Sequence, residues 1–153
     1  MGQVVALDAL LDTRRVWRGP VTAPAATPAQ PSGHAQLDAA LPTGGWPDAA
    51  LTEVLIAADG IGELQLLWPT LARLSETDGI IAVVAPPYLP FAAACPRAGV
   101  RLPTLQIIQA DGRNALWAAE QCLRSGACSA VLCWPLQADG RAPRRLQGAA
   151  ETR

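Results

Sequence analysis

The glycine-containing loop that follows residues 51–57 constrains the fold of this chain more than any other stretch. Residues 51–57 read Leu-Thr-Glu-Val-Leu-Ile-Ala and predict a buried first core strand, and Gly60 and Gly62 precede a helical pattern that begins at Glu63. A strand, a glycine loop and a helix are the layout of a phosphate-binding loop, in which backbone N–H groups and a helix N-terminus face an anion. The stretch therefore predicts an α/β core of the kind that binds nucleotides.

The side chains that a working phosphate loop needs are replaced in this chain. A Lys and then a Ser or Thr should follow the last glycine, where they hold the phosphates and a magnesium ion. Glu63 and Leu64 occupy these two places, and all 12 basic residues of the chain are Arg. A carboxylate repels phosphate, and a leucine side chain cannot coordinate magnesium. The degenerate loop of Gly60, Gly62, Glu63 and Leu64 therefore predicts a nucleotide-site framework with no bound cofactor.

Apolar runs alternate with amphipathic stretches through the rest of the core. Short connections between such elements imply a mainly parallel sheet with right-handed crossovers. We expect Asp111 and Gly126 to cap the two ends of one helix. The sequence predicts strands over residues 80–85, 104–109 and 129–134, and helices over residues 63–75, 90–98, 112–125 and 138–153.

The chain divides into an N-terminal arm, a linker and a core. Residues 1–18 predict a helical arm, with an apolar face followed by a basic cluster. We interpret the arm as a partner-binding element, with folding back onto its own sheet as the alternative. Residues 19–31 carry four prolines among small residues, so we expect an extended, semi-rigid linker before the core of residues 32–153. The candidate partner-binding residues of the arm are Val4, Leu7, Leu10, Leu11, Arg14, Arg15, Trp17 and Arg18.

Composition restricts the classes of partner. The formal net charge is −1, whereas strong non-specific binding to nucleic acid needs a basic face, so we expect weak or no direct DNA binding. No apolar run reaches the roughly 18–20 residues of a membrane span, and the N-terminus does not read as a signal peptide. We therefore expect a cytoplasmic protein that does not contact a membrane.

Several single residues invite a functional interpretation. His34 is the only histidine and the four cysteines form no Cys-x-x-Cys pair, so we predict no metal site and expect buried, reduced thiols. Asp59 and Glu63 flank the glycine loop and are interpreted as ordinary helix N-terminal carboxylates, with a metal or acid–base pair as the alternative. Tyr88 is either a contact aromatic or a lid over the former nucleotide site, and we expect Trp117 and Trp134 in the core.

Two blocks of the sequence resemble the core of the RecA recombinases. Residues 32–64 are similar to the RecA block Thr-Gly-x-x-x-Leu-Asp-x-Ala-Leu-x-x-Gly-Gly and the phosphate loop after it. Residues 115–134 are similar to the RecA helix, Arg-Ser-Gly-Ala turn and strand that lead to the magnesium-organising Asp, whose place Trp134 takes. Pro87 falls where RecA carries its catalytic glutamate. The resemblance implies a RecA-like core that is not an enzyme.

Most of residues 4–134 resemble ImuA, the RecA-like accessory protein of inducible mutagenesis. ImuA proteins share this degenerate core and an opening similar to residues 6–10 and 14–19. The resemblance implies a non-catalytic adaptor in SOS-induced translesion DNA synthesis, in contact with RecA, an ImuB-like Y-family protein and an error-prone DnaE-type polymerase. Self-association through the arm is a further expectation, and the core is expected to lack the C-terminal part of ImuA proteins.

The cell-division inhibitor SulA resembles the chain from about residue 51 onward. This resemblance implies the alternative function of an SOS-induced inhibitor that binds FtsZ and blocks its polymerisation. The arm and the block of residues 32–47 favour the ImuA-like interpretation. A weak enzyme that uses the remodelled loop is a third alternative.

Overall fold

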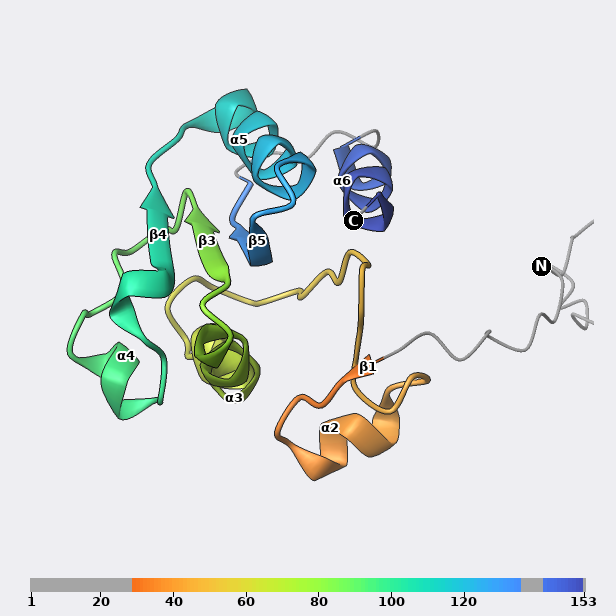
Figure 1. Cartoon of the computed structure of the whole chain (residues 1–153). Helices are drawn as coiled ribbons and strands as arrows, with labels where there is room; N and C mark the ends of the chain where they lie inside the picture. Colours follow the sequence, from red (N-terminus) through yellow and green to blue (C-terminus); the bar gives the residue numbers. More distant parts are fainter. Residues whose placement is uncertain (1–28, 136–141, 153) are drawn as a thin grey trace, which may run out of the picture.

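The computed structural model describes residues 29–135 and 142–152; the predicted arm and most of the predicted linker lie outside these residues. Its centre is a parallel sheet in the order β4-β3-β5, formed by β3 (Ile80–Val84), β4 (Leu105–Ile108) and β5 (Cys128–Cys133). Both flanking strands run parallel to β3 (Figure 1). The chain is therefore an α/β protein, as the alternating pattern predicted.

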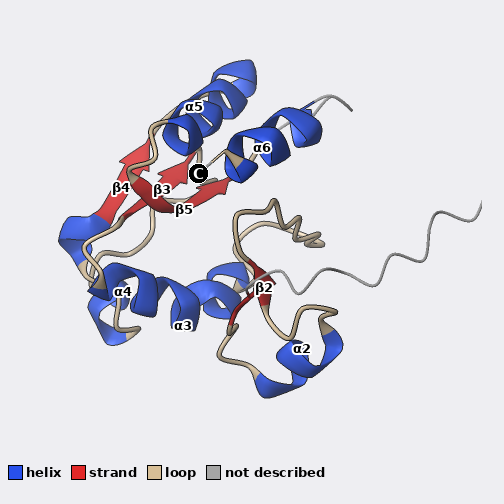
Figure 2. Ribbon diagram, turned by 45° about the vertical axis from the view of Figure 1, so that its right-hand side comes forward, coloured by secondary structure: helices blue, strands red, loops and turns tan. Residues whose placement is uncertain are grey.

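Helices cover both faces of the sheet (Figure 2). One face carries α3 (Glu63–Glu76) and the short α4 (Ala94–Arg97), and the other carries α5 (Gly112–Arg124) and α6 (Ala142–Glu151). Successive side chains of a strand point to opposite faces, so Ile81 and Val83 join the α3 side of the core while Ala82 and Val84 join the α5 side. The continuous apolar run of β3 is thus explained by burial on both faces.

A small N-terminal module, residues 29–47, lies beside α3 (Figure 2). It comprises the two-residue strands β1 (Ala29–Gln30) and β2 (Trp46–Pro47), paired antiparallel, and α2 (Ala35–Ala40) between them. Strand β1 thus begins at the end of the segment predicted as linker.

Hydrogen bonds from α3 hold this module in place. The Thr70 hydroxyl donates to the Pro31 carbonyl at 3.0 Å, and the Arg73 guanidinium donates to the same oxygen. Ser32 is fully buried, and its N–H donates to the Asp38 carboxylate at 2.9 Å. The module is therefore packed on the core through α3.

The strand predicted over residues 51–57 is wrong. Residues 51–56 have no regular secondary structure, and Leu55 is 87% exposed. The Leu51 N–H instead donates to the side chain of Gln147 in α6 at 2.7 Å. An apolar run becomes a strand only where a neighbouring strand supplies the ladder of hydrogen bonds, and among the described residues neither edge of the β4-β3-β5 sheet pairs with this segment.

Two smaller expectations also need correction. Asp111 stands at the N-cap position of α5, but its carboxylate accepts from the Asn114 side chain at 2.9 Å and caps no backbone N–H. Trp117 is 60% exposed instead of lying in the core, whereas Trp134 packs against the α3 side of the core as expected. No helix within residues 29–135 and 142–152 combines the length and the apolar character that crossing a membrane requires.

Candidate functional site

The glycine loop in front of α3 is the candidate site that the sequence singled out. Gly60 and Gly62 have φ of +78° and +106°, which is the left-handed region that glycine adopts without steric cost. Gly62 is the N-cap of α3, and no side chain caps the helix there. These two glycines let the chain turn so that backbone N–H groups face the start of the helix.

The carboxylate of Glu63 closes this loop from within. The Gly60 N–H donates to Oε1 of Glu63 at 3.2 Å, and the Gly62 N–H donates to Oε2 at 3.1 Å. Its own N–H and those of Gly60, Gly62 and Ile61 hold the pKa of Glu63 below its usual value, against a smaller opposing effect of desolvation. Glu63 is therefore an internal anion bound by the loop, a role beyond that of an ordinary helix N-terminal carboxylate.

This arrangement determines which ligands the loop can take. Amides that would face a phosphate in a nucleotide-binding loop already donate to a fixed negative charge. A phosphate would have to displace that carboxylate and would remain close to it, and like charges at such distances repel. The half-buried Leu64 and the exposed Asp59 complete the loop. Its geometry favours a structural turn over an anion site.

A second loop, residues 85–93, joins β3 to α4 and meets the glycine loop (Figure 1). A methyl group added to Gly60 would lie 3.1 Å from Cε2 of Tyr88, so the Tyr88 ring rests against that glycine. Tyr88 is nevertheless 69% exposed. One edge of its ring thus lies against the glycine loop while the remainder is open to solvent, and a contact role for Tyr88 stays a prediction.

The other two replaced positions follow the carboxyl ends of the strands. Trp134 comes directly after β5. Its backbone N–H donates to the Val84 carbonyl at 3.2 Å, and its side chain packs in the core. Pro87 is exposed in the loop after β3. Carboxyl ends of parallel strands are where α/β proteins bind ligands, and here these positions hold an indole and a proline.

The predicted partner-binding residues of the arm lie outside the described residues. They are Val4, Leu7, Leu10, Leu11, Arg14, Arg15, Trp17 and Arg18.

Sequence reasoning missed Glu120, the one buried acidic side chain among the described residues. Its carboxylate accepts from Arg145 of α6 and from Arg124 at 3.0 Å. Arg145, together with Arg124, holds the pKa of Glu120 below its usual value. The i,i+4 spacing of Glu120 and Arg124 signals one partner, but no sequence pattern signals Arg145, which joins α6 to α5.

The thiols are poorly suited to nucleophilic chemistry. Cys95 and Cys128 are buried and all four cysteines are free. Burial raises the pKa of Cys95, and it raises that of Cys133 to about 11. Since the thiolate is the reactive form, these two cysteines are held in the unreactive state.

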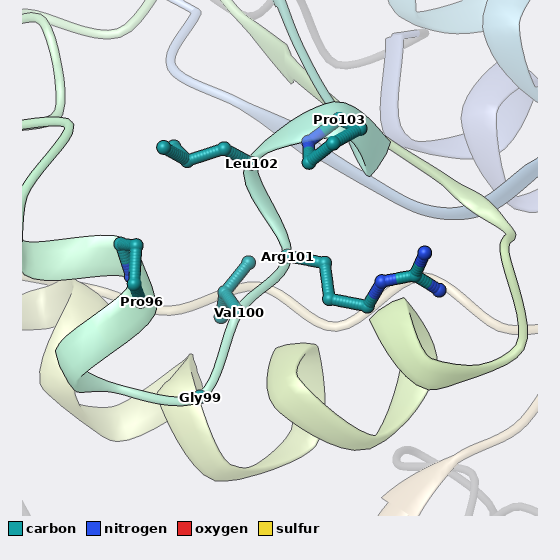
Figure 3. Close-up of a pocket in the computed structure, with 6 residues that line it drawn as sticks. All are labelled: Pro96, Gly99, Val100, Arg101, Leu102 and Pro103. Carbon is teal, nitrogen blue, oxygen red and sulfur yellow. The ribbon is translucent and has the colours of Figure 1, made fainter.

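An open hollow of about 410 Å³ lies at the end of α4 (Figure 3). Its lining is mainly apolar, and its one charged side chain, Arg101, is already paired with Asp78. A ligand site needs polar groups that converge on the ligand, so this hollow is a weaker candidate than the two loops. The residues that line it are Pro96, Gly99, Val100, Arg101, Leu102 and Pro103.

The parallel sheet with helices on both faces defines an α/β protein with a SulA-like fold. The sequence matches no protein-family model, and no curated protein matches it. Among the solved structures that match is SulA from Pseudomonas aeruginosa, with 29% sequence identity and a TM-score of 0.52 over 61% of this chain and 83% of that chain. The likeness supports the SulA part of the resemblance, and the finer resemblance to ImuA stays a prediction.

Proposed function

We propose that this chain is a non-catalytic RecA-like adaptor that acts in the cytoplasm during SOS-induced translesion DNA synthesis. The observation that carries the proposal is the closed glycine loop, in which both oxygens of the Glu63 carboxylate accept the N–H groups of Gly60 and Gly62. A RecA-like core with this loop has no phosphate site from which to drive an ATP cycle. It acts through protein contacts.

The N-terminal module supports the adaptor over the division inhibitor. The block of residues 32–47 is the part of the resemblance to RecA and ImuA that we do not expect in SulA, and here it is folded and bonded to α3 through Thr70 and Arg73. The match to SulA leaves more than a third of this chain without a counterpart. The resemblance to ImuA supplies the expected partners: RecA, an ImuB-like Y-family protein and an error-prone DnaE-type polymerase.

Calorimetry with magnesium-ATP tests the non-catalytic part of the proposal. We expect no binding, because Glu63, Leu64, Pro87 and Trp134 replace the groups that hold phosphate, metal and water. Glu63→Lys should not restore turnover, since the other three positions remain unsuited. Micromolar affinity of the unaltered chain for ATP would overturn this part.

Co-sedimentation with RecA filaments tests the contact part. We expect the full chain to sediment with the filaments and the double variant Leu7→Asp/Leu11→Asp to stay in the supernatant, because the charges destroy the apolar face of the arm. Circular dichroism checks that the variant keeps its fold. Equal sedimentation of both chains would exclude the arm as the docking element. Absence of the full chain from the pellet would exclude direct contact with RecA filaments.

The structural match to SulA supports a second candidate, an SOS-induced inhibitor of cell division. The match covers 83% of the SulA chain at 29% identity, which supports the idea that this chain and SulA share a surface that binds FtsZ. FtsZ polymerisation followed by light scattering distinguishes the two functions. Inhibition at equimolar protein, without association with RecA, would favour the inhibitor over the adaptor.

A further inference from the structure

The two loops present a group of exposed apolar side chains. We define this loop patch as Ile61, Tyr88, Leu89 and Phe91, each of which is between 64% and 73% exposed. The Tyr88 ring lies against Gly60, the neighbour of Ile61, so the two loops that carry these side chains adjoin. Exposed apolar side chains gathered on adjoining loops are a feature of interaction sites.

The loop patch is held in shape before any partner arrives. The Glu63 carboxylate fixes Gly60 and Gly62 on either side of Ile61. On the other loop, the Phe91 carbonyl accepts the N–H of Ala94 at 2.8 Å at the start of α4. A preorganised surface loses little conformational entropy on binding, which favours a docking role over a merely exposed loop.

The two stretches that carry the loop patch contain acidic residues and no basic residue. Residues 51–63 and 85–96 carry Glu53, Asp59 and Glu63 and no basic residue, and the first cation after them is Arg97 at the end of α4. Complementary charge steers association and fixes orientation. The surface therefore fits a segment that combines large apolar side chains with several positive charges.

Such a segment exists in the same chain. Residues 4–18 carry four large aliphatic side chains at helical spacing and then Arg14, Arg15 and Arg18 with Trp17 among them. Residues 19–28 separate this segment from β1, and an extended proline-rich linker of that length spans roughly 30 Å at about 3.1 Å per residue. This reach suffices to cross the surface of a domain of this size or to pass to a neighbouring copy.

We propose that residues 4–18 of this chain dock on the loop patch. Leu7, Leu10 and Leu11 cover the exposed side chains of the two loops, and the arginines that follow lie against Asp59 and the neighbouring carboxylates. The occupant of the patch is thus the chain's own basic amphipathic arm, as in other complexes where the apolar face of a helix lies in an apolar groove. This inference needs neither RecA nor DNA, and it goes beyond the proposed function, in which the same apolar face of the arm contacts RecA.

A photo-crosslinker at the loop patch tests the docking in the full chain. With p-benzoylphenylalanine in place of Phe91, illumination should yield crosslinks to residues 4–18, located by mass spectrometry. The matched control places the same group at Trp117, which is 60% exposed on α5, and should give no crosslink to the arm. The concentration dependence of the yield then shows whether the arm comes from the same copy or a second one; both results support the docking.

The arm variant makes the test specific. Leu7→Asp/Leu11→Asp removes two buried anchors, and the loss of anchor residues weakens an association by about 30-fold or more. The crosslink from position 91 should fall accordingly and should weaken at high salt, because exposed charges are screened. Absence of arm crosslinks at position 91, an equal yield from position 117, or an unchanged yield in the double variant would each overturn the proposal.

Discussion

Replacing Gly33 by alanine should loosen the N-terminal module from the core. Gly33 has φ of +85°, and a methyl group at this position would lie 2.3 Å from Cβ and 2.9 Å from Cγ of Pro69. The Pro69 ring is rigid and sits inside α3, so it cannot swing aside. The alanine variant must therefore shift either the module or the helix.

The size of the effect follows from three contributions. A non-glycine residue in the left-handed region costs about 1–2 kcal/mol, and forcing a methyl group into a packed contact costs about 1–3 kcal/mol. The reduced flexibility of the unfolded chain offsets about 0.4–1 kcal/mol of this. The free energy of unfolding should fall by roughly 2–4 kcal/mol, which for a chain of this length lowers Tm by roughly 6–12 °C.

Gly44→Ala is the matched control for thermal unfolding followed by circular dichroism. Gly44 also has positive φ, +74°, but a methyl group there meets no atom within 4 Å, so only the backbone strain remains and the net loss should be about 1 kcal/mol or less. Hydrogen exchange locates the effect. The Ser32 N–H, which donates to Asp38 at 2.9 Å, should lose protection in Gly33→Ala and keep it in Gly44→Ala.

The comparison of the two variants can refute this reasoning. Substitutions without a structural consequence usually differ by less than about 0.5 kcal/mol. If Gly33→Ala and Gly44→Ala unfold within that margin of each other, and Ser32 exchanges equally in both, Gly33 does not pack against Pro69 and the module is not anchored on α3.

Three further predictions concern ionisable side chains. Burial raises the pKa of Cys133 from 9.0 to about 11, so the folded state should lose stability as the pH rises through this range. Urea unfolding at a series of pH values should show that the free energy of unfolding falls less with rising pH in Cys133→Ala than in the unaltered chain. An identical dependence on pH would contradict the burial of Cys133. Arg145 and Arg124 lower the pKa of Glu120 below 4.5, so its contribution to stability is present above that value and is lost as the pH falls through the lowered pKa. Glu120→Gln should lower, at neutral pH, the protection of the α6 amides relative to their intrinsic exchange rate. Unchanged protection would disprove the link between α6 and α5. Glu63→Ala should accelerate exchange of the Gly60 and Gly62 amides without creating ATP binding, while Glu76→Ala at the exposed end of the same helix should leave both amides protected.

The core elements could be predicted where burial requires a recognisable pattern of apolar residues in the sequence. The apolar run of β3 reflects contacts on both faces of the sheet, and Gly126, predicted at the end of its helix, follows α5 at φ +68°. Trp117 shows the limit of such patterns. Ala115 and Ala119 are buried on the side of α5 that packs against the sheet, and Trp117, midway between them in sequence, points away from that face.

The prediction of a strand over residues 51–57 was wrong for a different reason. Its composition is that of a buried strand, but composition cannot show whether a neighbouring strand is free to pair, and Leu51 bonds to Gln147 of α6 instead. A contact across 96 residues is invisible to local patterns. The same holds for Glu120 and Arg145, which lie 25 residues apart.

The replacement at Glu63 was readable from the sequence, but its consequence was not. The sequence shows a carboxylate where a nucleotide-binding loop carries its lysine, and this predicts only the loss of phosphate binding. The structure adds that the carboxylate turns back onto the N–H groups of Gly60 and Gly62. That geometry depends on the φ angles of both glycines and on the conformation of the Glu63 side chain, neither of which the residue order specifies.

The two proposals, absence of nucleotide binding and docking at the loop patch, both involve the Glu63 side chain. In a loop that binds phosphate, the ligand supplies the anion that the backbone amides need, so the shape of the loop depends on the ligand. Here Glu63 supplies that anion, and the loop keeps its shape, with Ile61 exposed and Tyr88 resting against Gly60. On the docking proposal, Glu63 therefore keeps the loop patch in its binding conformation without any bound ligand. Its removal should weaken docking at the loop patch while leaving the interaction with nucleotide as weak as before.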